Sequence, residues 1–366
     1  MKNQNLEQGP TEFVTVSPEG TVTLSDSSLL LNADYSRDGS DLHLSGEDGS
    51  ELVVVGYFNP AHPPALRSRD GHMRSGETVA HLAGPVAPGQ YAQMATGGQF
   101  GEPIGQVEML DGTASAQRPN GINVELEVGS QVFQGDVVSA GDGATISITF
   151  VDKSIFTIED GASMVLNEMV YNPGGSSNSM LFNLIGGTAA FVSGAVAKSG
   201  DMKVETPVAV MAIRGTGPGA TCGEFAPGCV FGIDHGEYEI QHKLTGKVLA
   251  VVNDPSVPVT LPSIDAAPVS GAPNPTALAA LQKAFSNLSQ AIDSADQREA
   301  NGNPLINNPG TGSPDFGDNG GLQGIGGFFN AKFTTLLNEE QIVPPEDETN
   351  NQLEQLIQPE IPGATT

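Results

Sequence analysis

Short runs of β-forming residues alternate with glycine-containing turns between residues 104 and 262. Runs such as ATISITFV and SIFTIE are followed by turns such as Asp160-Gly161, and Gly141-Asp142-Gly143 precedes the first of them. Valine, isoleucine, threonine and phenylalanine favour strands, and glycine accepts the positive φ that tight turns require. Evenly spaced short strands with polar turns are typical of a sandwich, a barrel or a coiled β-solenoid. The sequence therefore predicts one all-β domain over residues 104–262.

Residues 11–86 contain a second set of short β-type runs, among them TEFVTV, DLHLSG and ELVVVGYF. The turns Arg37-Asp38-Gly39 and Glu47-Asp48-Gly49 separate them and are strong hairpin signals. The pattern predicts a small antiparallel β module over residues 11–86, in which NPAHPP at residues 59–64 breaks the sheet. Residues 87–103 show no periodicity, which indicates a linker.

An amphipathic helix is predicted over residues 274–302. Asn274-Pro275 is suited to the start of a helix, and Asn301-Gly302 is suited to its end. Its polar face carries little cationic charge, so docking on the β domain or pairing with a partner helix is favoured over contact with a membrane. One apolar stripe is formed by Leu278, Leu281, Phe285, Leu288 and Ile292.

The tail, residues 303–366, is rich in Asn, Gly and Pro and ends in an acidic stretch. Such a segment buries too little apolar surface to offset its ordering entropy, so we expect a disordered, low-complexity tail. The fold class expected for the whole chain is all-β, with a small antiparallel β module in front, and one amphipathic helix and this tail behind.

The charge of the chain restricts its partners. It carries 43 acidic and 15 basic residues, a formal net charge of −28. A phosphate backbone would require a stripe of Lys and Arg, so no nucleic-acid partner is expected, and anionic membrane surfaces are disfavoured. No apolar window is long enough for a membrane-spanning segment, and residues 1–16 contain no apolar core of a secretory signal peptide. The oligomeric state stays open.

Two cysteines, Cys222 and Cys229, flank Pro227-Gly228. This spacing suits a hairpin whose two arms face each other, and a disulfide can form if the Cα atoms lie within about 7 Å. The alternative is a pair of free thiols in a reducing compartment. Two cysteines supply too few ligands for a metal site.

Residues 104–216 contain Gly129, Gly135-Asp136, Gly141-Asp142-Gly143, Phe150 and Asp152, followed by LIGGTAAFVSG and VETPVAVMAIRGT. In this pattern they resemble the FecR domain. The family carries a pattern of the form "G…V..GD.V.TG..G...I.F.DGS...L", and the second half of that pattern is similar to LIGGTAAFVSG and VETPVAVMAIRGT of this chain. The resemblance rests on several separate motifs and not on one. The matching positions are Gly129, Gly135, Asp136, Gly141, Gly143, Phe150 and Asp152.

The resemblance implies a twisted, solenoid-like stack of short strands and two competing functions. The stretch SDLHLSGEDGSELVVVGYFNPAHPPAL is similar to the β-rich prefix of large secreted adhesins, as in FecR-domain proteins of alphaproteobacterial type. This implies a non-catalytic secreted or cell-surface module for interaction or attachment, with a protein or surface partner, and export by type I secretion through an uncleaved C-terminal signal. The calcium repeats of the large adhesins are not matched.

The alternative is a cell-envelope signalling module of the FecR sigma-factor-regulator type. Those regulators carry a short helical cytoplasmic segment and a single membrane helix, and the sequence pattern here contains neither, which favours the attachment module. The expected location is therefore secreted or at the cell surface, and the alternative is cytoplasmic.

The motif Ile213-Arg214-Gly215-Thr216 ends the FecR-like pattern where a strand is expected to leave the core. A guanidinium has five donors in a fixed fork. We therefore expect Arg214 to be structural, tying turn carbonyls or a carboxylate such as Asp201 or Glu205 across neighbouring strands. A clamp for the carboxylate of a ligand is the alternative.

Neither a cofactor nor a catalytic site is expected. The acidic turns at Asp136, Asp142, Asp152 and Asp160 offer oxygens for calcium, but their spacing fits no known calcium loop and suits tight turns. The histidines form no HExxH pattern, and no nucleophile elbow or phosphate-binding loop is found. His235 in GIDHGEY is expected to be a turn residue, and an enzyme is the third and least favoured function.

Overall fold

The computed structural model describes residues 11–16, 21–25, 27–85, 101–175, 177–199, 201–223, 226–271, 273–303 and 305. Strands make up 44% of these residues and helices 16%, so the mostly β class expected from the sequence is confirmed. Most of the predicted linker and all but two residues of the predicted tail lie outside the described residues.

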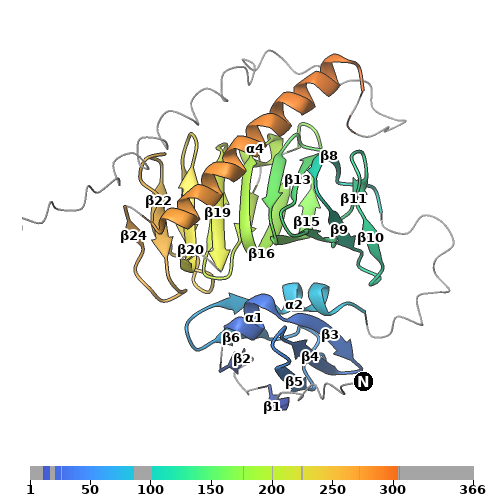
Figure 1. Cartoon of the computed structure of the whole chain (residues 1–366), viewed down its shortest axis with the longest axis vertical. Coiled ribbons are helices and arrows are strands. Elements are labelled where there is room, and N and C mark those ends of the chain that lie inside the picture. Colours follow the sequence, from blue (N-terminus) through green and yellow to red (C-terminus); the bar gives the residue numbers. More distant parts are fainter. Residues whose placement is uncertain are drawn as a thin grey trace, which may run out of the picture.

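The N-terminal module packs two small sheets and two helices around one apolar core (Figure 1). The core includes Leu24, Leu42, Leu52, Tyr57 and Val79, each with no exposed surface. The elements are β1 (Thr11–Thr15), β2 (Thr21–Leu24), α1 (Ser28–Asn32), β3 (Asp34–Asp38), β4 (Asp41–Ser45), β5 (Glu51–Val55), β6 (Ala65–Ser68), β7 (Met73–Arg74) and α2 (Gly76–Ala83).

The prediction that this module is antiparallel is wrong in part. The strands β3, β4 and β5 form antiparallel hairpins at the two Asp-Gly turns, as expected. However, β1 pairs with β5 and β2 pairs with β6 in parallel, and two helices are present. Parallel partners need a long crossover connection, and turn residues report only on strands that are adjacent in sequence. The sequence therefore indicated the hairpins and gave no signal for the parallel pairs.

The β domain consists of two stacked sheets that share the long strand β16. The module-facing sheet has the order β10-β9-β12-β15-β16-β17-β18-β21-β22, and the helix-facing sheet has the order β11-β8-β13-β14-β16-β19-β20-β23-β24. From these strand pairings, neither a closed barrel nor the expected solenoid is identified. The bounds are β8 (Gly105–Asp111), β9 (Ala114–Gln117), β10 (Asn123–Glu125), β11 (Gln131–Val132), β12 (Val137–Ala140), β13 (Thr145–Phe150), β14 (Ile155–Glu159), β15 (Ser163–Val170), β16 (Ser179–Val192), α3 (Ala195–Ser199), β17 (Asp201–Glu205), β18 (Val210–Ile213), β19 (Pro218–Gly223), β20 (Ala226–Ile233), β21 (Tyr238–Gln241), β22 (Val248–Val252), β23 (Val259–Leu261) and β24 (Val269–Ser270).

The core of the β domain lies between these sheets and contains four phenylalanines in contact. Phe156 stacks on Phe191 with ring centroids 4.4 Å apart, and Phe182 from the first half of β16 lies 4.9 Å from Phe150. Aromatic pairs at these separations add to the free energy gained from burial alone. The strand β16 reaches both sheets because its N-terminal half pairs with β17 and its C-terminal half with β19.

The helix α4 (Pro275–Ala300) crosses the outer face of the helix-facing sheet (Figure 1). The predicted stripe from Leu278 to Ile292 is buried against Ile155, Val192 and Val230, so the expected docking on the β domain is confirmed. Both predicted caps are present: the Asn274 side chain accepts from the Thr276 backbone N–H, and the helix ends at Asn301.

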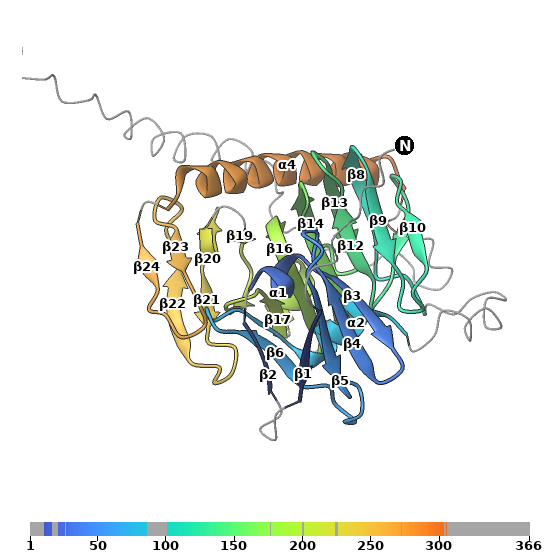
Figure 2. The same ribbon diagram turned by 60° about the horizontal axis from the view of Figure 1, so that its bottom comes forward.

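The N-terminal module lies on the side of the domain away from α4 (Figure 1 and Figure 2), and α1 and α2 contact the module-facing sheet at β16 and β15. Leu82 of α2 packs on Val137 and Ile185 of that sheet. Two backbone hydrogen bonds also join the parts. The Met73 N–H donates to the Pro207 carbonyl at 2.8 Å, and the Ile264 N–H donates to the Gly71 carbonyl of the module at 2.9 Å. The molecule is thus layered as helix, sheet, sheet and module.

Candidate binding cleft

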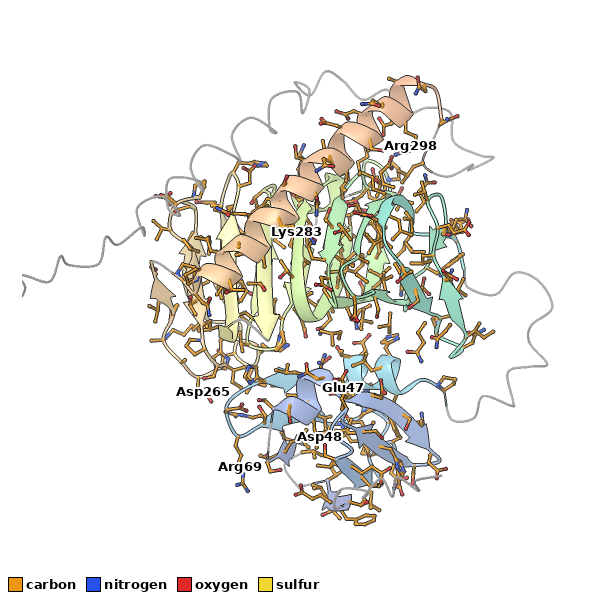
Figure 3. The ribbon with its side chains drawn as sticks, viewed as in Figure 1. Glu47, Asp48, Arg69, Asp265, Lys283 and Arg298 are labelled. Carbon is orange, nitrogen blue, oxygen red and sulfur yellow. A yellow bond between two sulfur atoms is a disulfide. The ribbon has the colours of Figure 1, made fainter. Side chains whose placement is uncertain are left out.

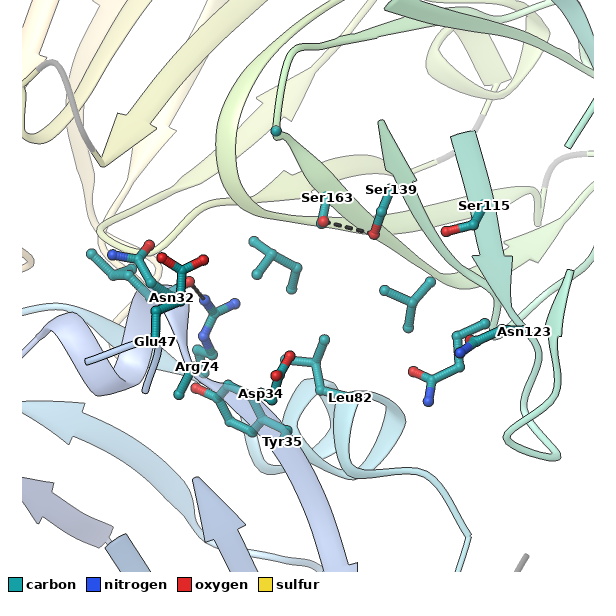
Figure 4. A pocket seen from close by; sticks show the side chains of 16 residues that line it. Asn32, Asp34, Tyr35, Glu47, Arg74, Leu82, Ser115, Asn123, Ser139 and Ser163 are labelled. Carbon is teal, nitrogen blue, oxygen red and sulfur yellow. Dashed lines mark hydrogen bonds between the residues drawn. The ribbon is translucent and has the colours of Figure 1, made fainter. Parts of the chain in front are cut away.

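A cleft of about 790 Å³ lies between the N-terminal module and the module-facing sheet (Figure 4). A second cavity of about 530 Å³ shares Asn32, Ser163 and Ile185 with it and extends past Glu159 toward Lys283 of α4 (Figure 3). The module lines the larger cleft with Asn32, Asp34, Tyr35, Glu47, Arg74 and Leu82, and the sheet lines it with Ser115, Asn123, Val137, Ser139, Ser163 and Ile185.

The floor of the cleft is a row of serine hydroxyls on three neighbouring strands. Ser115 of β9 lies opposite Ser139 of β12, which lies opposite Ser163 of β15. The Ser139 and Ser163 hydroxyl oxygens are 2.7 Å apart, and Ser115 is exposed. Each of these strands is paired on both sides, so its backbone groups are occupied in the sheet. The floor therefore offers side-chain hydroxyls and no strand edge.

Arg74 forms the module wall of the cleft and is only 2% exposed. Its Nε donates to the Leu30 carbonyl at 2.5 Å and its Nη2 to the Leu31 carbonyl at 3.0 Å, which fixes the guanidinium against α1. Its Nη1 has no hydrogen-bond partner among the described residues. Burial lowers the pKa of Arg74, but a guanidinium stays charged. A buried cation with a free donor therefore lines the cleft.

Tyr35 and the acidic side chains Asp34 and Glu47 lie beside this arginine. The Tyr35 hydroxyl donates to the Leu30 carbonyl at 2.6 Å, and burial raises the pKa of this phenol. Asp34 and Glu47 are exposed where the cleft opens. The wall thus combines one aromatic ring, hydrogen-bond acceptors at the rim and one buried cation.

A buried polar network ties the module to the sheet beyond the cleft. Asn183 donates to the Thr78 hydroxyl at 2.9 Å and to the Glu205 carboxylate at 3.1 Å. The Lys243 ammonium pairs with the same carboxylate at 3.2 Å and donates to the Thr206 carbonyl at 2.6 Å. Burial lowers the pKa of Lys243, which the Glu205 carboxylate opposes. Because every member has a partner, this network fixes how the two parts meet.

Gly135 and Asp136 of the FecR-like pattern lie in the turn before β12, close to α2. Gly135 has φ of +85°, and a Cβ there would meet Pro119 at 2.8 Å. Asp136 is fully buried, pairs with Arg118 and accepts from the Phe133 N–H at 2.8 Å. Burial raises the pKa of Asp136 to about 6, although both contacts lower it. Arg118, which sequence reasoning missed, is thus one of the architectural arginines.

The structural role expected for Arg214 is wrong. Its side chain is exposed, and it makes no hydrogen bond or ion pair in the described part of the chain. The two carboxylates proposed as its partners are occupied, because Asp201 pairs with Lys203 and Glu205 pairs with Lys243. The residue follows β18, where the strand has already left the core, so its guanidinium points to solvent rather than across the strands.

The neighbours of Arg214 in the motif have defined places. Ile213 ends β18 in the core at 2% exposure, and Gly215 has φ of +98°, which only glycine adopts readily. Thr216 is buried, and its backbone exchanges hydrogen bonds with Ser193. The motif therefore makes a turn that reconnects β18 to the second sheet.

Cys222 and Cys229 form a disulfide between directly opposed positions of β19 and β20, with Cα atoms 4.2 Å apart. Two of the acidic turns bind backbone groups: Asp152 accepts from the Ser154 and Val196 N–H groups, and Asp160 accepts from the Gly143 N–H. Among the described residues, no cluster of three or more His, Cys, Asp or Glu side chains has metal-site geometry.

His235 and Asp234 are hydrogen-bonded at 2.6 Å in an exposed turn after β20. The imidazole is 46% exposed and the Asp234 side chain 6% exposed. A His–Asp pair orients an imidazole in many catalytic sites, but this pair lies outside the two cavities described above. The residue is in the turn that the sequence predicted.

Comparisons with known proteins assign the chain to no family. No family model and no curated protein match it. It is similar to two crystal structures of a protein from Parabacteroides distasonis proposed to be an anti-sigma factor, at 13% and 14% identity and TM-scores of 0.30 and 0.29. The match covers 38% of this chain and 60% of that one. Within the described residues, no helix is long and apolar enough to cross a membrane.

Sequence reasoning missed the residues that form the cleft. Arg74 stands in a short strand between a buried histidine and α2, where nothing local marks it as buried. Ser115, Ser139 and Ser163 each sit at an outward position between apolar neighbours, which period-2 alternation could have indicated. Their alignment in one row depends on strand register, which the alternation does not give.

Proposed function

We propose that this chain is a FecR-domain protein. Its FecR-like glycines support the assignment, because Gly129, Gly135 and Gly143 all have positive φ and stand at turns. Both sheets also add strands in the same direction along the chain, from β10 and β11 to β22 and β24, as successive windings of a solenoid-like stack do. Leu66 and Val79 belong to a core separate from that of the β domain, which is consistent with an adhesin-like prefix.

The function that the geometry supports best is a non-catalytic module for attachment or interaction at the cell surface. The cleft of about 790 Å³ carries this proposal, since two separately cored bodies meet there around polar side chains. Clefts of this size at the junction of two bodies are common binding sites. The partner is a protein or a surface component that fits between them.

The test uses beads coated with the full chain and measures their adhesion to cells of its own host and of neighbouring species. Ser115→Phe places a ring in the cleft from an exposed floor position, and Thr23→Phe adds the same ring at an exposed position of β2 outside it. We expect Ser115→Phe to abolish adhesion and Thr23→Phe to leave it unchanged. Equal adhesion of all three proteins would contradict the proposed role of the cleft.

A signalling module of the cell envelope is the second candidate. The buried network of Asn183, Glu205 and Lys243 favours it, because it couples the two bodies, and a signalling module requires that a change in one body reaches the other. Transcript measurements after deletion of the gene discriminate between the two functions. Signalling would be established by a set of sigma-dependent genes that respond when the wild-type chain is restored and not when the cleft is filled by Ser115→Phe.

Export through a C-terminal signal is part of the proposal, with the secreted or surface location that it implies. Residues 303–366 carry one basic residue, Lys332, and prolines recur after Ile342, which suits a segment that stays accessible until translation ends. Fusion of residues 303–366 to a passive reporter is expected to export it, and deletion of these residues is expected to retain the chain inside. A reporter that stays inside, or a deleted chain still secreted, would overturn this.

A further inference from the structure

We propose that the cleft binds an acidic saccharide, whose carboxylate pairs with Arg74 and whose hydroxyls face the serine row. The inference rests on the proposed attachment function and names its ligand class. Its starting point is Arg74 Nη1, a donor on a side chain 2% exposed that has no partner among the described residues. Leaving such a donor unpaired is costly, and a charged donor is paired most strongly by a carboxylate. Figure 4 shows this guanidinium at the cleft wall.

The floor narrows the class of molecule further. Ser115, Ser139 and Ser163 present hydroxyls that both donate and accept, and their strands have no free backbone edge. An extended peptide binds a sheet through an edge, which this floor does not offer. A polyhydroxylated ligand instead exchanges hydrogen bonds with side chains alone. A saccharide therefore fits the floor better than a peptide.

The walls complete the match. The side chains of Asn32 and Asn123 offer donors and acceptors, while the exposed carboxylates Asp34 and Glu47 at the rim accept hydrogen bonds from hydroxyls. These rim carboxylates repel a polyanion, so one carboxylate per bound unit, placed deep at the arginine, is what the cleft admits. The volume of about 790 Å³ lies in the range of pockets for small ligands.

The experiment is isothermal titration of the full chain with three acidic trisaccharides that carry one carboxylate each: sialyllactose, maltotrionate and cellotrionate. Maltotriose is the neutral control of similar size, and tetra-alanine with a free carboxylate tests a peptide terminus. We expect at least one acidic probe to bind, and maltotriose to bind at least about tenfold more weakly, as a lost hydrogen bond to a charged group implies.

Three variants locate the site. Arg74→Lys keeps the positive charge but removes the planar guanidinium with its paired N–H donors. It is expected to weaken the binding of acidic probes about tenfold or more. Because Arg74 also braces α1, the exposed-site variant Ser115→Phe is the second readout and is expected to abolish binding, while Thr23→Phe is not.

Every outcome decides the proposal. Binding of an acidic probe that Ser115→Phe removes supports it. No binding of any acidic probe at ~1 mM, equal binding of maltotriose, or binding only of tetra-alanine overturns it. Binding that survives Ser115→Phe also overturns it, because the site would then lie elsewhere. If bead adhesion depends on the cleft while no acidic saccharide binds, the attachment function stands and this inference alone fails.

Discussion

The two outer faces of the β domain belong to similar sheets but differ in polarity: one is apolar and covered, and the other is polar and lines a cleft. The helix-facing sheet presents Ala190, Val192 and Val230, and α4 covers it with a continuous apolar stripe. A Cβ at Gly219 would meet the Phe285 ring at 2.8 Å, so this face is shaped for close contact. The module-facing sheet presents a row of serines, and the module stands off to leave the cleft. Side chains of strand residues that point outward thus decide whether a sheet face is sealed or left open.

The largest effect is expected from a substitution in the helix-facing sheet's contact with α4, which is the sealed face. Phe285→Ala removes a ring that is 1% exposed in the contact between α4 and the sheet. Loss of a buried phenylalanine costs about 3–5 kcal/mol of unfolding free energy. Urea denaturation followed by circular dichroism measures it, and Ser139→Ala on the open face is the matched control, expected to cost less than about 1 kcal/mol. Equal costs would show that both faces are packed alike.

The disulfide at the end of the sealed face comes next. Breaking it with Cys222→Ser and Cys229→Ser frees a loop with a sequence separation of 7, for which chain entropy predicts a loss of about 2 kcal/mol. Thermal unfolding of the double variant measures it. Thiol titration of protein recovered from its native location is the complementary check, and two free thiols there would reverse the proposed location outside the cytoplasm.

Asp136 gives the open side a pH dependence. Burial raises its folded pKa from 3.8 to about 6, so the folded state binds more protons than the unfolded state between those values. Its contribution is fully present below pH 4 and is lost as pH rises through 6, an effect of about 1 kcal/mol between pH 5 and pH 7. Asp136→Asn should flatten this slope in urea titrations. An unchanged slope would contradict the shift.

Arg214 provides the smallest effect. Because it is exposed and has no partner in the described part of the chain, Arg214→Ala is expected to change the unfolding free energy by less than about 0.5 kcal/mol. Arg118→Ala, which leaves the buried Asp136 unpaired, should cost several times more. Comparable losses in the two variants would restore the structural role first expected for Arg214.

The sequence predicted features that depend on neighbouring residues and missed features that depend on contacts between distant residues. The stripe from Leu278 to Ile292 is a local period, so it predicted α4 and its docking. Asp-Gly turns predicted the hairpins of the module but not its parallel pairs. The importance of Arg74 depends on contacts with residues 30 and 31, more than forty positions away, so no local pattern could have indicated it.

The position of α4 at the end of the described residues has a consequence during synthesis. The apolar outer face of the helix-facing sheet is complete at Val230, but its cover extends to Ala300. At about 5–20 residues per second, a ribosome leaves that face bare for several seconds. The nascent chain therefore cannot bury this face until nearly all of the described residues have emerged from the ribosome.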